Sequence, residues 1–264
     1  MIWALLLACL GPSSAPQASL DSSQEPALYL APAGSSVLAG GDLRWVFRAW
    51  PELGPLDEIG LGELRPVGLI GGRRGLLAVL PGGELERIRG TSELSLARSD
   101  ADRANLVLPE GGRIQARQHE GFLLLGDLAQ VQRVIEPEEL LEDPAGDIPA
   151  GESWVLLRHP RRLLEEASAR LAREGLGQDL ARFRQDSGWT LAGLESVGVA
   201  RSGDRLLVRV SCPRACSRRE LLQARLAVQA LLLAELPAGW RPVLAGLRLQ
   251  RVDDHIEGEA RIPR

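Results

Sequence analysis

Apolar and polar positions alternate over short stretches of the second half of the chain, which is typical of half-buried β-strands. Turn signals separate these stretches: Ser202-Gly203-Asp204 divides one pair, and Asp253-Asp254 divides another. Strands joined by such tight turns form antiparallel hairpins. The predicted strands cover residues 153–157, 194–200, 205–210, 246–252 and 256–262.

Between these strands the spacing of apolar residues changes to that of helices. One helix is predicted from Pro160, because proline is tolerated in the first turn and leucines recur on one face after it. Ser217 and Glu220 form a capping box that predicts a second helix, extending to about Leu236. This second helix is apolar almost all round, so we expect it at the buried centre of its module.

The first half of the chain carries signals of the same kinds. An apolar strand is predicted at 122–125, and Asp127 with Gln130 forms a capping pair that predicts a helix directly after it. Another helix is predicted from Asp42, after the apolar pair Val37-Leu38.

The two halves also repeat one another. Six identical positions between Leu61 and Leu77 recur with the same spacing between Leu191 and Leu207. Two shorter matches flank them: Val37-Leu38 with Val155-Leu156, and Arg113-Ile114-Gln115 with Arg248-Leu249-Gln250. Because these features follow in the same order in both halves, the sequence predicts an internal duplication.

Each half is therefore predicted to form a β-α-β-β-α-β-β module. Strands joined by tight hairpins favour an antiparallel fold over a doubly wound parallel sheet. The expected fold class is α+β, with two similar modules whose antiparallel sheets pack on helices. An acidic stretch broken by prolines, 136–151, is predicted to link a first module at 27–135 to a second at 152–264.

Charge is divided unevenly between the halves. The chain has a formal net charge of −4, and all of its basic residues are arginine. Residues 1–149 contain 12 Arg against 21 acidic residues, whereas residues 150–264 contain 19 Arg against 14. Either the halves attract one another, or the second half faces an anionic partner such as a phospholipid headgroup or an envelope polymer. Nucleic acid is not expected, because no binding motif accompanies the arginines.

The chain opens on an apolar run that is too short to span a bilayer, which needs about 20 residues. The run suits the core of a secretory signal, although only the terminal amine is positive before it. Leu6-Leu7-Ala8-Cys9 resembles the lipobox of bacterial lipoproteins, which implies that Cys9 is lipidated after cleavage. Residues 1–26 are thus expected to hold a signal peptide, the lipobox and a flexible tether. The alternatives are a soluble exported protein and a chain without an export signal.

Two cysteines remain if Cys9 is lipidated. Cys212 and Cys216 are separated by three residues at a predicted turn, so a disulfide can join them. A disulfide agrees with export into an oxidising compartment. A redox pair is the alternative, because Cys216 comes just before a helix start.

No catalytic signature is found in the sequence. The three histidines, His119, His159 and His255, all fall at predicted turns. The chain lacks a Gly-x-Ser-x-Gly elbow and the glycine patterns of Walker and dinucleotide sites. The acidic residues around His255 lack the loop spacing that Ca²⁺ requires. We therefore predict no catalytic residue, no cofactor and no metal site.

The segment Pro32-Ala33-Gly34-Ser35-Ser36 runs directly into the predicted strand at Val37-Leu38. In this segment and in the order of its elements, the chain resembles an uncharacterised class of exported bacterial proteins. In that class a Pro-Ala-x-Ser/Thr segment leads into a strand, a helix and a hairpin, and the unit is repeated. The resemblance implies a duplicated α+β module and brings no catalytic residues with it.

Together these features favour a non-enzymatic protein of the bacterial cell envelope, held to the membrane by a lipid on Cys9. Its expected role is to bind or scaffold another envelope component, either a protein or an anionic polymer. The alternative is an envelope hydrolase with a dispersed site in which Asp253, His255 or His119 takes part. That alternative requires the three side chains to converge in a pocket.

Overall fold

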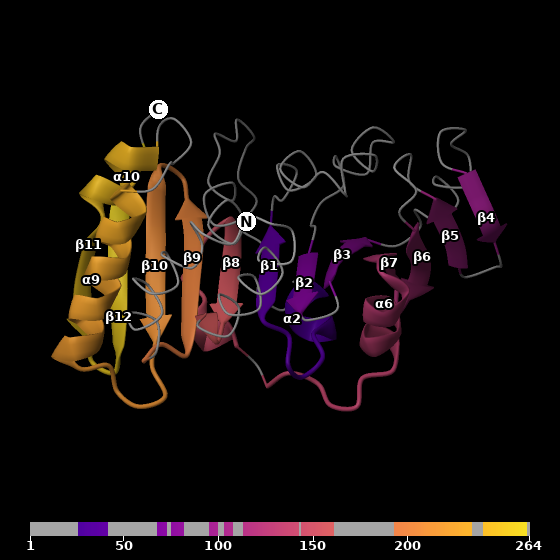
Figure 1. The fold of residues 1–264 in the computed structure, drawn as a ribbon, viewed down its shortest axis with the longest axis horizontal. Helices are drawn as coiled ribbons and strands as arrows, with labels where there is room; N and C mark the ends of the chain where they lie inside the picture. Colours follow the sequence, from indigo (N-terminus) through magenta and orange to yellow (C-terminus); the bar gives the residue numbers. More distant parts are fainter. Residues whose placement is uncertain are drawn as a thin grey trace, which may run out of the picture. The chain divides into compact units, whose positions relative to one another are not determined.

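The computed structural model describes the chain in nine segments, drawn as coloured ribbon in Figure 1. They are residues 26–41, 68–72, 75–81, 95–99, 103–107, 113–142, 144–160, 193–233 and 240–262. The chain divides into two compact units between Ala145 and Gly146, inside the predicted linker. We call residues 15–145 the first unit and residues 146–264 the second unit.

The first unit is built on an antiparallel sheet whose described strands run in the order β1-β2-β3-β7-β6-β5-β4. The strands are β1 (Val37–Gly41), β2 (Gly68–Gly72), β3 (Gly75–Pro81), β4 (Ser95–Ser99), β5 (Arg103–Val107), β6 (Arg113–His119) and β7 (Phe122–Gly126). The central strands are the most apolar, and their side chains are fully buried at Leu69, Ile70, Leu77, Val79 and Leu124. Burying each of these side chains stabilises the fold by about 1.5–3 kcal/mol relative to leaving it exposed.

Two helices accompany this sheet. The short helix α2 (Pro26–Leu30) contacts β1, β2 and β3, and α6 (Leu128–Ile135) contacts β3, β6 and β7. The start of α6 is capped as predicted on one side, because Asp127 Oδ1 accepts a hydrogen bond from the Ala129 amide at 2.8 Å. The other half of the predicted pair is wrong. Gln130 turns into the core, where it is fully buried.

The second unit is built on a five-stranded antiparallel sheet in the order β11-β12-β10-β9-β8. Its strands are β8 (Ser153–Arg158), β9 (Ser196–Ser202), β10 (Arg205–Ser211), β11 (Arg248–Val252) and β12 (His255–Arg261). The predicted hairpins are present. Their turns place Gly203 and Asp253 at positive φ, 60° and 49°, as two-residue hairpin turns require.

The described helices of this unit pack against the β11 and β12 part of its sheet. The helix α9 (Arg218–Leu233) contacts β11 and α10 (Trp240–Gly246), and α10 contacts β12, as Figure 1 shows at the β11 side of the unit. Above this part of the sheet a core forms from Val210, Ile256, Leu249, Ala224 and Cys216. The prediction that α9 is the buried centre is wrong, because Leu222 is 58% exposed and Arg225 is exposed. The helix packs at the side of the sheet, and one of its faces is exposed to solvent.

One strand-pairing scheme occurs in both units. In the first unit the strands follow β1-β2-β3-β7-β6, and in the second β8-β9-β10-β12-β11. The β2–β3 hairpin pairs Gly72 with Gly75, and the β9–β10 hairpin pairs Ser202 with Arg205. These two pairs are related by the same offset in sequence that relates Leu61 to Leu191. The order and the register are those that an internal duplication predicts.

The two flanking sequence matches are displaced by two residues from the residues that occupy equivalent places in the two sheets. Leu38 pairs with Ile70, and Ala200, the repeat counterpart of Ile70, pairs with Trp154 instead of Leu156. A two-residue shift returns each side chain to the same face of the sheet, because strand side chains alternate with a period of two. The alternating pattern is therefore preserved although the identities are misaligned.

The predicted fold class, a balanced α+β fold with sheets packed on helices, is wrong. The described chain is dominated by antiparallel strands, with few helices. The first unit contains an additional hairpin, β4–β5, that its polar sequence did not reveal. The helix predicted from Asp42, and the helix after Pro160, lie outside the described residues. Within them, no helix is both long and apolar enough to cross a membrane.

Candidate binding face of the second unit

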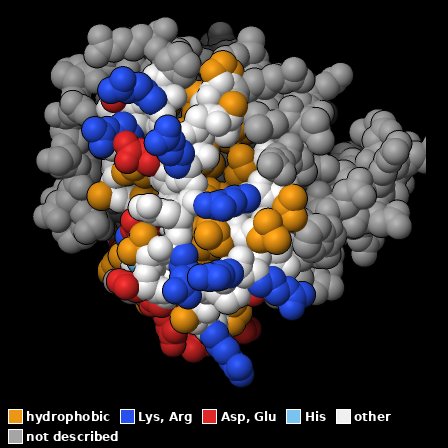
Figure 2. All heavy atoms as spheres, turned by 90° about the vertical axis from the view of Figure 1, so that its left-hand side faces the viewer, with side chains coloured by type: hydrophobic (Ala, Val, Ile, Leu, Met, Phe, Trp, Pro, Cys, Tyr) orange, Lys and Arg blue, Asp and Glu red, His pale blue; other side chains and the backbone are white. Residues whose placement is uncertain are grey.

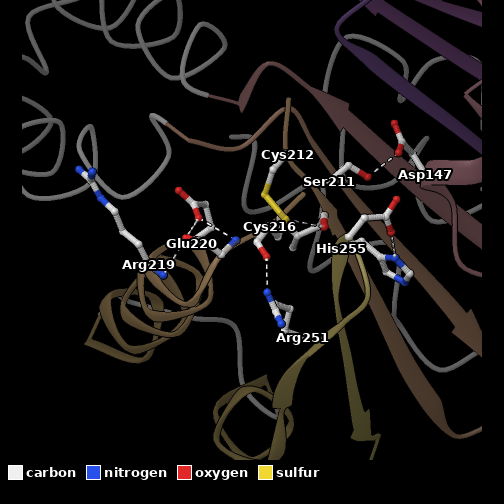
Figure 3. The surroundings of a disulfide bond; sticks show 11 residues. Asp147, Ser211, Cys212, Cys216, Arg219, Glu220, Arg251 and His255 are labelled. Atoms are coloured by element: carbon white, nitrogen blue, oxygen red, sulfur yellow. Dashed lines mark hydrogen bonds and ion pairs between the residues drawn. A yellow bond between two sulfur atoms is a disulfide. The ribbon is translucent and has the colours of Figure 1, made fainter. Parts of the chain in front are cut away.

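Cys212 and Cys216 form the predicted disulfide at the junction between β10 and α9, with their Cα atoms 5.4 Å apart. Cys216 is fully buried, and its amide donates to the Asp254 carbonyl at 2.8 Å. Arg251 reaches the Cys216 carbonyl at 3.4 Å, as Figure 3 shows. The disulfide loop therefore joins the start of α9 to the turn of the β11–β12 hairpin. This is a structural role, since the sulfur of Cys216 is shielded from solvent.

The start of α9 is closed by the predicted capping box. Ser217 Oγ accepts a hydrogen bond from the Arg219 amide at 3.1 Å, and the Glu220 carboxylate accepts from the Ser217 amide at 2.9 Å. The Ser217 hydroxyl also donates to that carboxylate. These hydrogen bonds hold the pKa of Glu220 below its usual range. The helix start thus has its own anionic partner.

Away from α9, the opposite face of the sheet carries charged residues in rows that follow the strand register. In one row Gln250, Glu257 and Arg209 lie side by side on β11, β12 and β10. In the next row, Arg248 and Leu207 flank Glu259. In the third, Arg205 lies opposite Arg261. Residues two apart on a strand share a face, so these rows form one continuous surface, which we call the charged face.

Ion pairs link residues of the charged face both within a row and between neighbouring rows. Arg209 lies 2.8 Å from Glu257, and Arg205 lies 3.2 Å from Glu259. Arg261 pairs with Asp204 in the hairpin turn at 3.3 Å. Two like charges directly opposite one another destabilise a sheet. Each arginine of the Arg205–Arg261 pair therefore turns toward a carboxylate.

A groove of about 570 Å³ lies over the charged face, within the range of small-ligand sites. Its walls include Arg209, Arg248, Glu257, Glu259 and Arg261. Figure 2, which faces the β11 side, shows arginine side chains gathered on this end of the described chain. Arg248 and Arg261 are both exposed. The groove is therefore open, and five charged side chains line it together with Gln250 and with apolar residues and glycines.

One wall of the groove is the last part of the predicted linker. Pro149 and Ala150 line it, and the turn η4 (Ala145–Asp147) precedes them. This segment of chain crosses β9 at Gly198, where a Cβ would stand 2.1 Å from the Asp147 carbonyl oxygen, so only glycine fits. We call residues 146–150 the strap.

Side chains of β10 hold the strap on the sheet. Ser211 Oγ donates to Asp147 Oδ1 at 2.5 Å, and Arg209 donates to the Gly146 carbonyl at 2.8 Å. The Ser211–Asp147 contact is drawn in Figure 3. The end of the linker at 146–150 is consequently a fixed part of the second unit.

His255 closes the other end of the charged face. Its Nδ1 lies 2.9 Å from Asp254 Oδ1, and its Nε2 lies 3.0 Å from Glu257 Oε1. These contacts raise the pKa of His255, with Asp254 the larger cause. In turn, Arg209 and then His255 hold the pKa of Glu257 low, and His255 holds the pKa of Asp254 low. The imidazole thus favours its charged form, with a carboxylate at each nitrogen.

The residues proposed for a dispersed hydrolase site are divided between the two units. His119 ends β6 in the first unit, whereas Asp253 and His255 belong to the second unit. Asp253 is an exposed turn residue at positive φ. A general base needs a free ring nitrogen to accept a proton, and both nitrogens of His255 already face carboxylates. No group of three or more His, Cys, Asp or Glu side chains in the described residues is placed to hold a metal ion. The lipidation candidate Cys9 lies outside those residues.

Comparisons with known proteins give no family. No protein-family model matches the chain, and no curated protein matches it. Among solved structures, crystal forms I, IV and III of TP0453 are similar at TM-scores of 0.43, 0.43 and 0.46 and identities of 7%, 8% and 8%. The likeness covers 92%, 91% and 93% of this chain and 93%, 94% and 96% of those chains. At these values it assigns neither a family nor a function.

The charged face was not predicted from the sequence. The sequence predicted the strands of this face. It did not single out the face, because arginines and glutamates at alternate positions of two hairpins are typical of any solvated strand. What brings Arg248 beside Glu259, or Arg209 beside Glu257, is the pairing of β12 with both β10 and β11. The long gap between β10 and β11 in the sequence hides this arrangement.

Proposed function

We propose that the protein is a non-enzymatic binding or scaffold protein of the bacterial cell envelope, anchored by a lipid on Cys9. In this proposal the second unit carries the binding surface, which is the groove over the charged face. The observation that carries the proposal is the groove itself: it is open, polar and held in shape by ion pairs and by the strap. Preformed pockets with a few placed polar groups are the usual form of ligand sites.

The chemistry of the groove favours binding over catalysis. Its two glutamates, Glu257 and Glu259, both accept ion pairs from arginine. His255, which ends the charged face, has a carboxylate at each nitrogen. Groups held in this way position a ligand, whereas a hydrolase needs a nucleophile beside a base that can accept its proton. The envelope-hydrolase alternative gains no support from these contacts.

The envelope location rests on two features. One is the lipobox-like Leu6-Leu7-Ala8-Cys9 with the polar residues that follow it. The other is the disulfide between Cys212 and Cys216, a bond that persists in oxidising compartments and is rare in the cytosol.

The anchoring part of the proposal is tested by the intact mass of the protein from separated membrane and soluble fractions of a bacterial host. We expect a membrane-bound form that is cleaved before Cys9 and carries a diacylglycerol mass. Alkylation should reach Cys212 and Cys216 only after reduction. A soluble form that retains its first residues and has both thiols free would contradict the proposal.

The binding part is tested by placing a photo-reactive residue at Gln250, which lines the groove, in cells that produce the protein. Arg214, exposed in the disulfide loop of the same unit, is the matched control position. We expect an envelope component to be crosslinked from position 250 and not from position 214. Equal crosslinking from both, or from neither, would count against the groove as the binding surface.

A further inference from the structure

We propose that the groove over the charged face binds an anionic ligand, one that carries a carboxylate or phosphate group, through Arg248. This inference rests on the proposed binding function and names the chemistry of the ligand. It places the anion at the end of the groove where three arginines surround Glu259.

The strand register defines that cluster. Arg248 lies directly opposite Glu259 on β11, and Arg261 follows Glu259 by two residues on β12. Arg205 lies diagonally across on β10, within 3.2 Å of Glu259. On one face of a sheet, direct neighbours lie about 4.5–5.5 Å apart between Cβ atoms and diagonal ones about 7–8 Å. Arg248 and Arg261 line the groove together with Glu259, and Arg205 adjoins it through its ion pair with Glu259.

The carboxylates nearby do not neutralise all three arginines. Glu259 accepts an ion pair from Arg205, and Asp204 accepts one from Arg261. Among the described residues, no hydrogen bond or ion pair is found for the side chain of Arg248, which is exposed. Its guanidinium is therefore left to bind a ligand.

The acidic residues of the groove cannot serve a cationic ligand equally well. Glu257 already faces both Arg209 and His255, whose hydrogen bonds keep its pKa low and its charge compensated. Glu259 is compensated by Arg205. An incoming cation would have to displace an arginine, whereas an incoming anion meets in Arg248 a guanidinium without an ion-pair partner among the described residues.

The arginine side chain also selects the type of anion. A guanidinium presents parallel N–H donors that match the two oxygens of a carboxylate or phosphate. Gln250, one row along on the same strand, adds an amide that can donate or accept at the body of the ligand. The groove, at about 570 Å³, is large enough for a charged group together with a polar body.

The test is calorimetric titration of the full chain with two probes, pyrophosphate and citrate, at low ionic strength. Arg248→Gln removes the free guanidinium, and Arg218→Gln, on exposed α9 surface outside the groove, is the control with the same change of charge. We expect Arg248→Gln to weaken binding about tenfold and Arg218→Gln to leave it unchanged. Circular dichroism verifies that each variant is folded.

A variant of opposite sign makes the result specific. Glu259→Gln removes the carboxylate that competes for the arginines, so we expect it to tighten binding several-fold. A structural role for Glu259 alone would not produce tighter binding. Binding of pyrophosphate alone identifies a phosphate ligand, binding of citrate alone identifies a carboxylate ligand, and either result supports the inference.

The inference is overturned if neither probe binds saturably, if the Arg248 and Arg218 variants behave alike, or if Glu259→Gln weakens binding. These outcomes are separate from the crosslinking test. Crosslinking from position 250 without anion binding would refute the ligand class and retain the binding function. Anion binding without crosslinking would retain the ligand class and would count against the groove as the surface that binds an envelope component.

Discussion

Gln130 is fully buried against the first sheet, and neither atom of its side-chain amide has a hydrogen-bond partner among the described residues. An unsatisfied buried polar group costs about 1–3 kcal/mol. The helix α6 tolerates this cost because Val131 and Val134 bury apolar surface on the same side. The residue is thus placed by the packing of the helix, and its own chemistry opposes that placement.

Replacing Gln130 with methionine should stabilise the protein. Methionine is also unbranched, of similar length and a good helix former, so it fills the site without the unpaired amide. We expect the free energy of unfolding in urea to rise by about 1–3 kcal/mol. Gln132→Met, at a half-buried position of the same helix, should change it by less than about 0.5 kcal/mol. Destabilisation by Gln130→Met would show that the amide has a partner in solution.

His255 should make stability depend on pH. Its pKa is raised from 6.5 by Asp254 and Glu257, so its contribution is complete below about pH 6.5 and is lost as the pH rises through the higher folded value. The lowered pKa values of Asp254 and Glu257 act in the opposite sense at acidic pH. Their contributions are present above their ordinary values, 3.8 and 4.5, and are lost as the pH falls through the folded ones.

Urea unfolding of the wild type and His255→Gln at pH 5.5, 7 and 8.5 tests this expectation. The difference in stability between the two proteins should be largest at pH 5.5 and should shrink toward pH 8.5. A titration of the His255 ring signals by NMR should give a midpoint above the ordinary value of 6.5. A difference that grows with pH would contradict the arrangement of the two carboxylates.

At the scale of the element, the start of α9 is decided by local signals and its position by packing. Its start is defined by close neighbours, because Ser217 and Glu220 satisfy amides that the helix itself cannot. Its position depends on distant residues: Arg225 donates to the Leu249 carbonyl at 2.9 Å, which covers part of the outer edge of β11. An uncovered edge strand is a site of unwanted pairing.

Removing the cap of α9 should destabilise the second unit. Ser217→Ala leaves the Arg219 amide without its acceptor, and we expect a loss of about 0.5–2 kcal/mol in the free energy of unfolding. Ser217→Asp restores an acceptor oxygen and should recover much of the loss. A measured effect near zero for Ser217→Ala would show that water replaces the hydroxyl at this helix start.

At the scale of the whole molecule, the two units share one pairing scheme and differ in what they add to it. Among the described elements, the first unit adds the β4–β5 hairpin and α6, and the second adds α9, α10 and the disulfide. The shared part consists of five antiparallel strands, in the order β1-β2-β3-β7-β6 in the first unit and β8-β9-β10-β12-β11 in the second. This common order supports the hypothesis of a duplicated ancestor. The charged face and the groove belong to the second unit, where they lie on strands of the shared scheme and on the strap.

Reduction of the disulfide should loosen the second unit and leave the first unchanged. A loop of this size contributes about 2 kcal/mol by the chain-entropy argument. Hydrogen exchange of the full chain, before and after reduction, should show faster exchange at the β10–α9 junction and in the β11–β12 turn. Exchange in β3 and β7 should stay the same. The double variant Cys212→Ser, Cys216→Ser should behave like the reduced protein; if it does not, the disulfide loop does not join α9 to the hairpin.

The amino-acid sequence by itself determined the features that depend on near neighbours: the hairpin turns at Gly203 and Asp253, the caps at Asp127 and Ser217, and the disulfide. Tertiary structure decided which strands lie side by side, and with them the burial of Gln130, the exposed side of α9 and the cluster around Glu259. The physical reason is the distance along the chain. A turn or a cap is formed by residues close together in the sequence, whereas Arg205 and Glu259 meet only because β10 pairs with β12, a strand that follows α9 and α10. Alternating patterns show that a strand has two faces, and only the completed sheet shows which face stays open to bind.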